Sequence, residues 1–565
     1  MFFSMTKTTG GRTLEKAKDF LQKKRNRVAV AFAAAVILGI AVYFMTNSGE
    51  DSAEVLYKAE KELAGQKREE TAVGIQNYQG GLHPAFAEYS GEKTLSDLLF
   101  SPLIRIKQDG SIDYILAEDI DVSSKGKTYT VRLKDGLKYS DGSKLAAADV
   151  KKDLLLLGDG RSSFGFRDCF ARLKGYDSNK LTQSEDMEGI EVKDDITLVF
   201  HFTEPDPANM YLFTGGIGRT ANRAKNKYLY TGAFMLKGQP ANLPMTLEAN
   251  PNYYDGKVKE KNILVKNINS NNIEAMLTKG NVDITQFQAN KSLISRLKKS
   301  GVITLYHGSS DVQAVLDFKS DSKSAVNKKE VRQAVCYAFQ KERFVTDSLG
   351  DSGQAAFSNF KEGSFMAGAE KEMYPYSKEK AEECLKNAGY EKNKKGIFEK
   401  GGKELSLTLK ADGILYADLF VQQFTKDMKA AGIIVKTTDS GNYDLYYRNA
   451  AIPSLTSVGA FLDERNFQDE KLVSLNARLK KAEDLKEAGK VCKEIDEKIL
   501  NESLTMPVYT ERKFAAVGNG SHKIEVKDID RPFSELLKYQ EEQNQRGQHR
   551  ILPPFFSVSQ RESFT

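Results

Sequence analysis

Histidine is the side chain that most often binds a metal or moves a proton in a catalytic site, and this chain has five of them. They are spread along the sequence at His83, His201, His307, His522 and His549. No two are separated by the roughly three to five residues that zinc motifs use. The spacing therefore indicates no metal site, and we expect no metal or other cofactor.

Other short motifs that carry a catalytic mechanism are also missing from the sequence. Gly-x-Ser-x-Gly, the phosphate loop and a dinucleotide-binding Gly-x-Gly-x-x-Gly before a helix do not occur. Residues 215–218 (GGIG) resemble a phosphate loop only in composition, and we interpret them as a turn. The carboxylate pair Asp194 and Asp195 lies in a hydrophilic turn, where general acid–base catalysis is disfavoured. The sequence thus predicts a binding protein and not an enzyme.

The charge of the chain is concentrated at its start. Residues 1–27 hold eight lysines and arginines and two acids, which accounts for the whole net charge of +6. The rest of the chain is therefore neutral, whereas a nucleic-acid-binding protein needs a concentrated basic face. We expect no nucleic-acid partner.

An uncharged run follows this basic segment. Residues 28–45 are 18 residues without a charged side chain, which as a helix span about 27 Å, enough for the bilayer hydrocarbon. Basic residues stay on the cytoplasmic side. We therefore predict a cytoplasmic segment at 1–27, a single-pass anchor in the cell membrane at 28–46, and an extracytoplasmic remainder. A cleavable signal peptide is the alternative.

Patterns of apolar residues divide the chain after the anchor. Residues 47–70 are highly charged and predict a solvated spacer, so we expect ordered structure to begin near Thr71. Alternating strands such as 128–133 and 196–202 follow. Residues 541–565 lose all periodicity and are predicted to be disordered.

From about residue 325 the spacing becomes helical. Residues 331–339 predict an amphipathic helix, a second helix runs from the N-cap Ser377 to Gly389, and a third ends at Gly432 before a strand at 433–435. One long helix is expected over 470–500. Three cysteines fall on the apolar stripes of these helices, so we expect buried thiols and no disulfide framework.

Five segments share turn, strand and helix signals with one known family. They are residues 126–150 (including LKYSDGSKLAAADV), 231–234 with 250–254, 280–284, 331–339 (VRQAVCYAF) and 376–390. In this order they resemble the extracytoplasmic solute-binding proteins of family 5, which serve oligopeptide and dipeptide ABC importers.

The resemblance implies an α/β, two-lobed, periplasmic-binding-protein-like clamshell, here preceded by one transmembrane helix. The first lobe would be discontinuous, comprising 71–315 with an inserted β-rich subdomain and 507–540. The second lobe would comprise 316–506. Ligand would close the lobes by a hinge motion, and the closed monomer would dock on permease subunits.

One segment departs from the family pattern. Peptide-binding members usually carry a tryptophan and an acid that hold the peptide ammonium. Residues 442–453 (NYDLYYRNAAIP) retain Tyr443, Asp444 and Leu445, but they have no tryptophan, and the position of the ammonium-binding acid falls on Ile452 or Pro453. The guanidinium of Arg448 suits a carboxylate or phosphate instead, although a solvated Arg448 is the alternative. Tyr446 and Tyr447 point to opposite faces, so at most one lines the cleft. The predicted ligand-contacting residues are Tyr446, Tyr447, Arg448 and Asn449, with Asn77, Tyr78 and His83 at the cleft edge.

The sequence therefore predicts a membrane-anchored substrate-binding component of an ABC importer. Its ligand would be a peptide or a related small organic molecule. The alternative is a diverged ligand sensor or interaction module that uses the same scaffold without transport.

Overall fold

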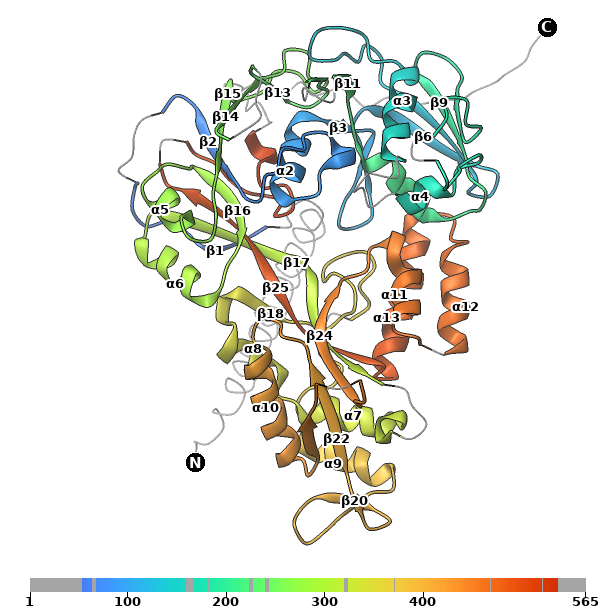
Figure 1. The fold of residues 1–565 in the computed structure, drawn as a ribbon, viewed down its shortest axis with the longest axis vertical. Coiled ribbons are helices and arrows are strands. Elements are labelled where there is room, and N and C mark those ends of the chain that lie inside the picture. Colours follow the sequence, from blue (N-terminus) through green and yellow to red (C-terminus); the bar gives the residue numbers. More distant parts are fainter. Residues whose placement is uncertain are drawn as a thin grey trace, which may run out of the picture.

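A single mixed sheet runs through the molecule (Figure 1). The computed structural model describes residues 53–63, 68–158, 167–180, 183–222, 227–238, 243–319, 324–369, 371–439, 441–467, 469–520 and 522–536. Within these residues, the path across the sheet is β13 (Phe234–Leu236), β14 (Met245–Ala249), β15 (Asn262–Asn267), β2 (Thr71–Ile75), β16 (Ile284–Gln288), β25 (Thr505–Gly518), β17 (Ile303–Phe318), β24 (Leu445–Ala451), β22 (Ser406–Ala411) and β23 (Ile434–Thr437).

The two long central strands of this sheet belong to both lobes. The first half of β17 pairs with the last half of β25, from Ile303 opposite Gly518 to Ser309 opposite Arg512. The register then shifts, and pairing resumes with Gln313 opposite Thr510. Such a bulge bends the strands and increases their twist. The lobes therefore meet at a bend in two continuous antiparallel strands, close to the predicted crossover.

The first lobe surrounds the outer part of these strands. Side chains from β2, β14, β15 and the end of β25 share one hydrophobic core with Val526, Ile529 and Phe533, which come from the C-terminal segment. The C-terminal segment therefore packs into the core of the first lobe, and the predicted lobe limits stay a prediction. Its further elements are α2 (Ser90–Leu99), α5 (Ile273–Thr278), α6 (Lys291–Ser300), β11 (Arg219–Asn222), β12 (Lys227–Leu229) and the 3-10 helices at Pro84–Phe86 and Ser534–Leu536.

A β-rich subdomain is inserted in the first lobe, at the upper right of Figure 1. Its antiparallel sheet has the order β6 (Ala117–Ser123), β7 (Thr128–Leu133), β9 (Thr197–His201) and β8 (Ile190–Val192). The alternation predicted over 128–133 is confirmed, because Tyr129, Val131 and Leu133 on one face of β7 are buried. The remaining elements are β3 (Ser101–Pro102), β4 (Ile104–Ile106), β5 (Ile112–Tyr114), β10 (Gly216–Ile217), α3 (Ala147–Leu157), α4 (Arg167–Ala171) and the 3-10 helix Pro207–Thr214.

The second lobe packs helices against β22, β24 and the inner ends of β17 and β25. The predicted caps are confirmed, because Ser377 accepts a hydrogen bond from the Lys380 amide, and Gly389 and Gly432 adopt φ values of 82° and 84°. The elements are α7 (Lys329–Ala338), α8 (Lys341–Ser348), α9 (Lys378–Asn387), α10 (Ala417–Ala430), β18 (Gly353–Ala355), β19 (Glu391–Lys392), β20 (Phe398–Lys400), β21 (Lys403–Glu404) and the 3-10 helices Ala325–Asn327 and Gly350–Ser352.

A helical layer completes the second lobe below the inserted subdomain (Figure 1). It contains the 3-10 helix Leu455–Ser457, α11 (Val458–Glu464), α12 (Glu470–Leu479) and α13 (Leu485–Asn501). The expected single helix over 470–500 is therefore wrong. Asp484 accepts a hydrogen bond from the Glu487 amide, and this N-cap starts a new helix after a reversal of the chain.

The first described strand corrects another expectation. β1 (Glu54–Tyr57) pairs antiparallel with β17, with Glu54 opposite His307 and Val55 opposite Tyr306. The prediction that ordered structure begins near Thr71 is wrong, because the outer edge of β17 takes its hydrogen-bond partners from the charged segment.

Three predicted segments lie outside the described residues, namely the cytoplasmic segment 1–27, the anchor 28–46 and the tail 541–565. Among the helices that are described, none has the length and apolarity needed to cross a membrane. The four cysteines are free. Of the three on the predicted apolar helix stripes, Cys336 and Cys492 are buried as expected, whereas Cys384 is only partly buried; Cys169 is buried as well.

The contact between β1 and β17 predicts a pH dependence of stability. His307 is 8% exposed, and its Nε2 lies 3.6 Å from the carboxylate of Glu54. Desolvation and the nearby Arg512 lower the pKa of His307, although Glu54 and Asp351 oppose them. A histidine whose pKa is lower in the folded than in the unfolded state contributes fully to the free energy of unfolding above its unfolded pKa of about 6.5. That contribution to stability is lost as the pH falls through the pKa of the folded state.

We therefore expect the urea midpoint of the protein to fall on acidification below about pH 6.5. His307→Gln should show a smaller fall, because it removes the group that must stay neutral. His201→Gln, at a partly exposed position on β9, is the control and should keep the wild-type fall. An unchanged pH profile in His307→Gln would contradict this assignment.

Candidate functional site

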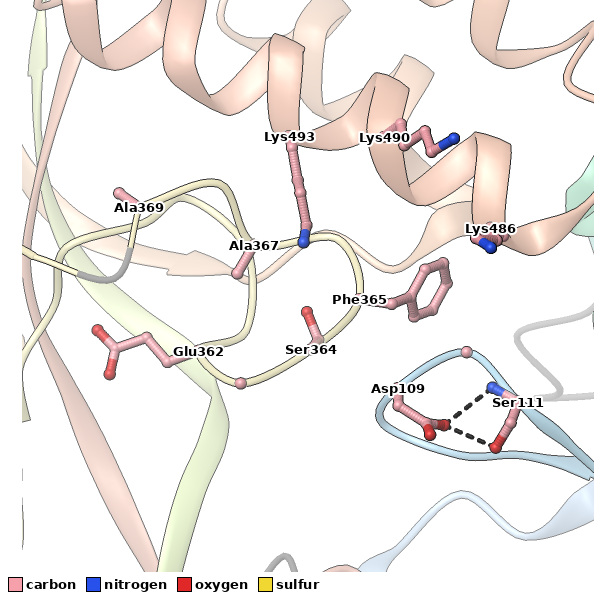
Figure 2. A pocket seen from close by; sticks show the side chains of 12 residues that line it. Asp109, Ser111, Glu362, Ser364, Phe365, Ala367, Ala369, Lys486, Lys490 and Lys493 are labelled. Carbon is pink, nitrogen blue, oxygen red and sulfur yellow. Dashed lines mark hydrogen bonds between the residues drawn. The ribbon is translucent and has the colours of Figure 1, made fainter. Parts of the chain in front are cut away.

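Both lobes contribute to a pocket of about 810 Å³ (Figure 2). This volume is in the range that small-molecule sites usually have. The first lobe supplies Asp109, Gly110 and Ser111 from the turn between β4 and β5. The second lobe supplies residues of the loop after β18 and of α13, namely Glu362, Gly363, Ser364, Phe365, Ala367, Ala369, Lys486, Lys490 and Lys493.

Phe365 joins the walls of this pocket. Its amide donates a 2.8 Å hydrogen bond to the carbonyl of Gln108 in the first-lobe turn. A Cβ atom on Gly110 would lie 3.0 Å from the Phe365 ring, and one on Gly489 of α13 would lie 2.7 Å from it. The ring thus fits between two positions where any larger residue would push it away.

A buried carboxylate holds the pocket loop on α13. Asp496 has no exposed surface and accepts hydrogen bonds from the Ser358 hydroxyl (2.6 Å) and the Asn359 amide (2.9 Å). It also accepts from Asn359 Nδ2 (3.0 Å) and from the Gly368 amide (3.2 Å). A buried charge needs such compensation, and here it fixes both ends of the loop that carries Phe365.

The acidic side chains of the pocket have hydrogen-bond partners within the protein, whereas the lysines that line it form no ion pair among the described residues. Asp109 accepts hydrogen bonds from the hydroxyl and amide of Ser111, and these lower the pKa of Asp109. Glu362 accepts hydrogen bonds from the Phe357 amide and from Gln354, while desolvation raises its pKa. The three lysines of α13 that line the pocket, Lys486, Lys490 and Lys493, are exposed, and none of them has a carboxylate oxygen within 4.0 Å among the described residues.

A second group of charges ties the lobes together beside the bend. Lys361 precedes the pocket loop in the second lobe, and its Nζ lies 2.7 Å from Asp530, in the segment that packs on the first lobe. Asp311 and Lys513 at the bend complete the group. Lys361 also lies 3.2 Å from Asp311. Lys513 lies 2.6 Å from Asp311 and 2.7 Å from Asp530. Desolvation opposes ionisation of Asp311, but the two lysines outweigh it and lower its pKa.

The residues predicted at the cleft edge are not among those that line this pocket. Asn77 is exposed, with φ at 53°, and Tyr78 has a buried hydroxyl, so that desolvation raises its pKa to about 12. His83 is fully buried, accepts a hydrogen bond from the Ala85 amide at Nδ1 and contacts Asp153 at 2.8 Å through Nε2. The enclosed His83 thus joins its loop to α3, which gives it a structural role.

The four residues predicted on β24 divide between two faces, as expected. Tyr447 is buried and stacks on Phe420 at 3.6 Å, whereas Tyr446 donates a hydrogen bond to Asp412 from the other face. Arg448 is held by Asp317 and Glu464, each at 2.8 Å, and Asn449 is exposed.

None of the seven predicted residues is among those that line the described pocket. The role of these residues in ligand binding stays a prediction. His83 and Tyr447 are fully buried, so the structure gives no support for contact between their side chains and a ligand. In the described part of the chain, no three histidine, cysteine or acidic side chains come together in a geometry suited to a metal ion.

Comparison with known families identifies the scaffold. A sequence model described as "Bacterial extracellular solute-binding proteins, family 5 Middle" matches residues 112–461, more than half of the chain. The protein belongs to this family. Members of the family are solute-binding proteins and not enzymes, and the two-lobed architecture agrees with that membership.

Two relatives show how far this likeness extends. This chain is 29% identical over 343 residues to the dipeptide-binding protein of Lactococcus lactis, and the match covers 55% of this chain and 61% of the relative. It is 23% identical over 449 residues to the oligopeptide-binding protein AppA of Bacillus subtilis, covering 73% of this chain and 76% of the relative. The match thus spans less than two thirds of the Lactococcus protein.

Solved structures share the fold. The ABC transporter substrate-binding protein CtaP of Listeria monocytogenes has a TM-score of 0.66 at 18% identity, covering 84% of this chain and 98% of CtaP. The unliganded open form of the periplasmic murein tripeptide-binding protein MppA has a TM-score of 0.68 at 19% identity, covering 80% and 93%.

Sequence reasoning missed the residues that build the pocket, although the sequence carries two signals for them. Asp496 falls on the apolar stripe of its helix, between Cys492 and Ile499, which indicates a buried carboxylate with partners. Lys486, Lys490 and Lys493 recur at the spacing of one helix face. The contact of the β4–β5 turn with a loop about 250 residues further along has no local signal.

The network around Asp496 gives a stability prediction for the solute-binding protein. Asp496→Asn should lower the free energy of unfolding by about 1–3 kcal/mol, because an amide nitrogen then faces buried donors. Asp463→Asn, at an exposed position on α11, is the matched control and should stay within about 0.5 kcal/mol of wild type. Urea denaturation measures both, and equal stabilities of the two variants would refute the role of Asp496.

Proposed function

We propose that this protein is the substrate-binding component of a peptide ABC importer and that it binds its ligand in the pocket between the two lobes. The observation that carries the proposal is that both lobes build the pocket walls and that Phe365 links them. Closing two lobes on a solute buries it and changes the shape that a permease recognises. Relatives named as dipeptide- and oligopeptide-binding proteins support the class of ligand.

The site of action proposed here is the outer face of the cell membrane. The family is described as extracellular, and the uncharged run at 28–45 behind a basic segment favours retention of the N-terminus as a single-pass anchor. The binding lobes would then meet the permease subunits as an anchored monomer. A sensor without transport would use the same scaffold, but no feature of the pocket favours it.

A thermal-shift experiment tests the binding proposal. Pools of peptides of two to six residues should raise the melting temperature, since a ligand at 100 times its Kd adds about 2.7 kcal/mol. Phe365→Ala should lose much of this rise, because it removes the side chain that joins the walls. Tyr376→Ala, an exposed aromatic residue that does not line the pocket, is the control and should retain the rise.

Free amino acids and sugars serve as negative ligands in the same assay. If no peptide pool raises the melting temperature of the wild-type chain, the proposal of a peptide receptor is refuted. If the pools act equally on Phe365→Ala and wild type, peptides bind at another place.

A further inference from the structure

One face of α13 presents a row of lysines to the pocket. Lys486, Lys490 and Lys493 follow the i, i+4, i+7 spacing, so their Cα atoms span two helical turns, or about 10 Å. All three are exposed, and no ion pair is found for them within the described residues. Lysines elsewhere on this layer do find acids, as Lys498 does with Asp469 and Glu502.

The two acids that line the pocket accept hydrogen bonds from other groups. Asp109 is occupied by Ser111 within its own turn, and Glu362 is occupied by Gln354 and the Phe357 amide. The pocket wall therefore carries three lysines and two carboxylates, and none of the three lysines forms an ion pair with either carboxylate among the described residues. Because the lysines outnumber the acids of the wall, an anion that enters the pocket would meet a net attraction from α13.

A neutral hydrogen-bonding group lies beside the row. Ser364 lines the pocket, and its Oγ is buried without a hydrogen-bond partner in the described structure. Figure 2 shows the side chain of Lys493 extending from α13 toward the loop that carries Ser364 and Ala367. A buried hydroxyl without a partner costs free energy unless a bound group satisfies it.

From these observations we infer that the pocket selects solutes with acidic side chains. The ligand class, resting on the proposed function, is an acidic peptide whose carboxylates contact the lysine row while Ser364 donates a hydrogen bond. Three lysines across two turns fit more than one negative charge, whereas a terminal carboxylate alone would occupy one of them. The site differs from the β24 segment, where Arg448 is already neutralised by Asp317 and Glu464.

Calorimetric titration with matched peptide pools tests this inference. One pool of tri- to hexapeptides contains glutamate, the second has glutamine at the same positions, and the third has glutamate with an amidated C-terminus. Wild type should bind the glutamate pool about tenfold more tightly than the glutamine pool, because each exposed lysine contact adds a factor of roughly two to three. The preference should shrink at about 1 M salt, where the Debye length is about 3 Å.

The decisive variant replaces all three lysines, as Lys486→Gln, Lys490→Gln and Lys493→Gln together. It should bind both pools alike, at the affinity of wild type for the glutamine pool. Its control, Lys378→Gln, Lys386→Gln and Lys394→Gln, makes the same change in charge at exposed positions outside the pocket and should keep the preference.

The outcomes separate the two proposals. If peptides bind wild type without a preference for glutamate, or if the preference survives in the triple pocket variant, the inference is overturned and the peptide receptor stands. If only amidation of the C-terminus weakens binding, selection of acidic side chains is likewise overturned. If no pool binds wild type, both the proposed function and the inference fail.

Discussion

Two continuous antiparallel strands, β17 and β25, are the element on which the rest of the structure depends. Each strand pairs with first-lobe strands at one end and with second-lobe strands at the other. Backbone hydrogen bonds between them therefore connect the two lobes through one continuous pair of strands. The shift of register between Ser309 and Gln313 places the bend at the boundary between the lobes.

Contacts on either side of this bend determine what the lobes can enclose. The ion pairs of Lys361 and Lys513 with Asp311 and Asp530 hold the lobes beside the strands, at separations of 2.6–3.2 Å. Partly exposed ion pairs are individually weak, so such a tie is suited to opening and closing. Asp496, by contrast, is buried and fully partnered, which keeps the pocket loop in place on α13.

Local signals predicted much of the fold and little of the site. The alternation of apolar and polar residues correctly predicted which face of β7 is buried. The capping residues Ser377, Gly389 and Gly432 correctly predicted helix ends. Both signals depend only on residues that are close in the sequence. β1 was missed because its four residues, EVLY, lie within a highly charged segment and form a strand only where the edge of β17 is present to pair with them. The pocket was missed because Phe365 and Gly110 are far apart in the sequence and come into contact only in the folded chain. The ion pairs of Arg448 were missed for the same reason, because its partners Asp317 and Glu464 come from β17 and α11.

Amide hydrogen exchange measured with and without an acidic peptide pool tests the central claim, that one ligand is held by both lobes. We expect slower exchange in two segments at once, the first-lobe turn at 107–111 and the second-lobe loop at 362–369. Regions that line no part of the pocket, such as β19–β21, should exchange at an unchanged rate. Protection confined to one lobe, or the absence of protection while the peptide is bound, would contradict the account.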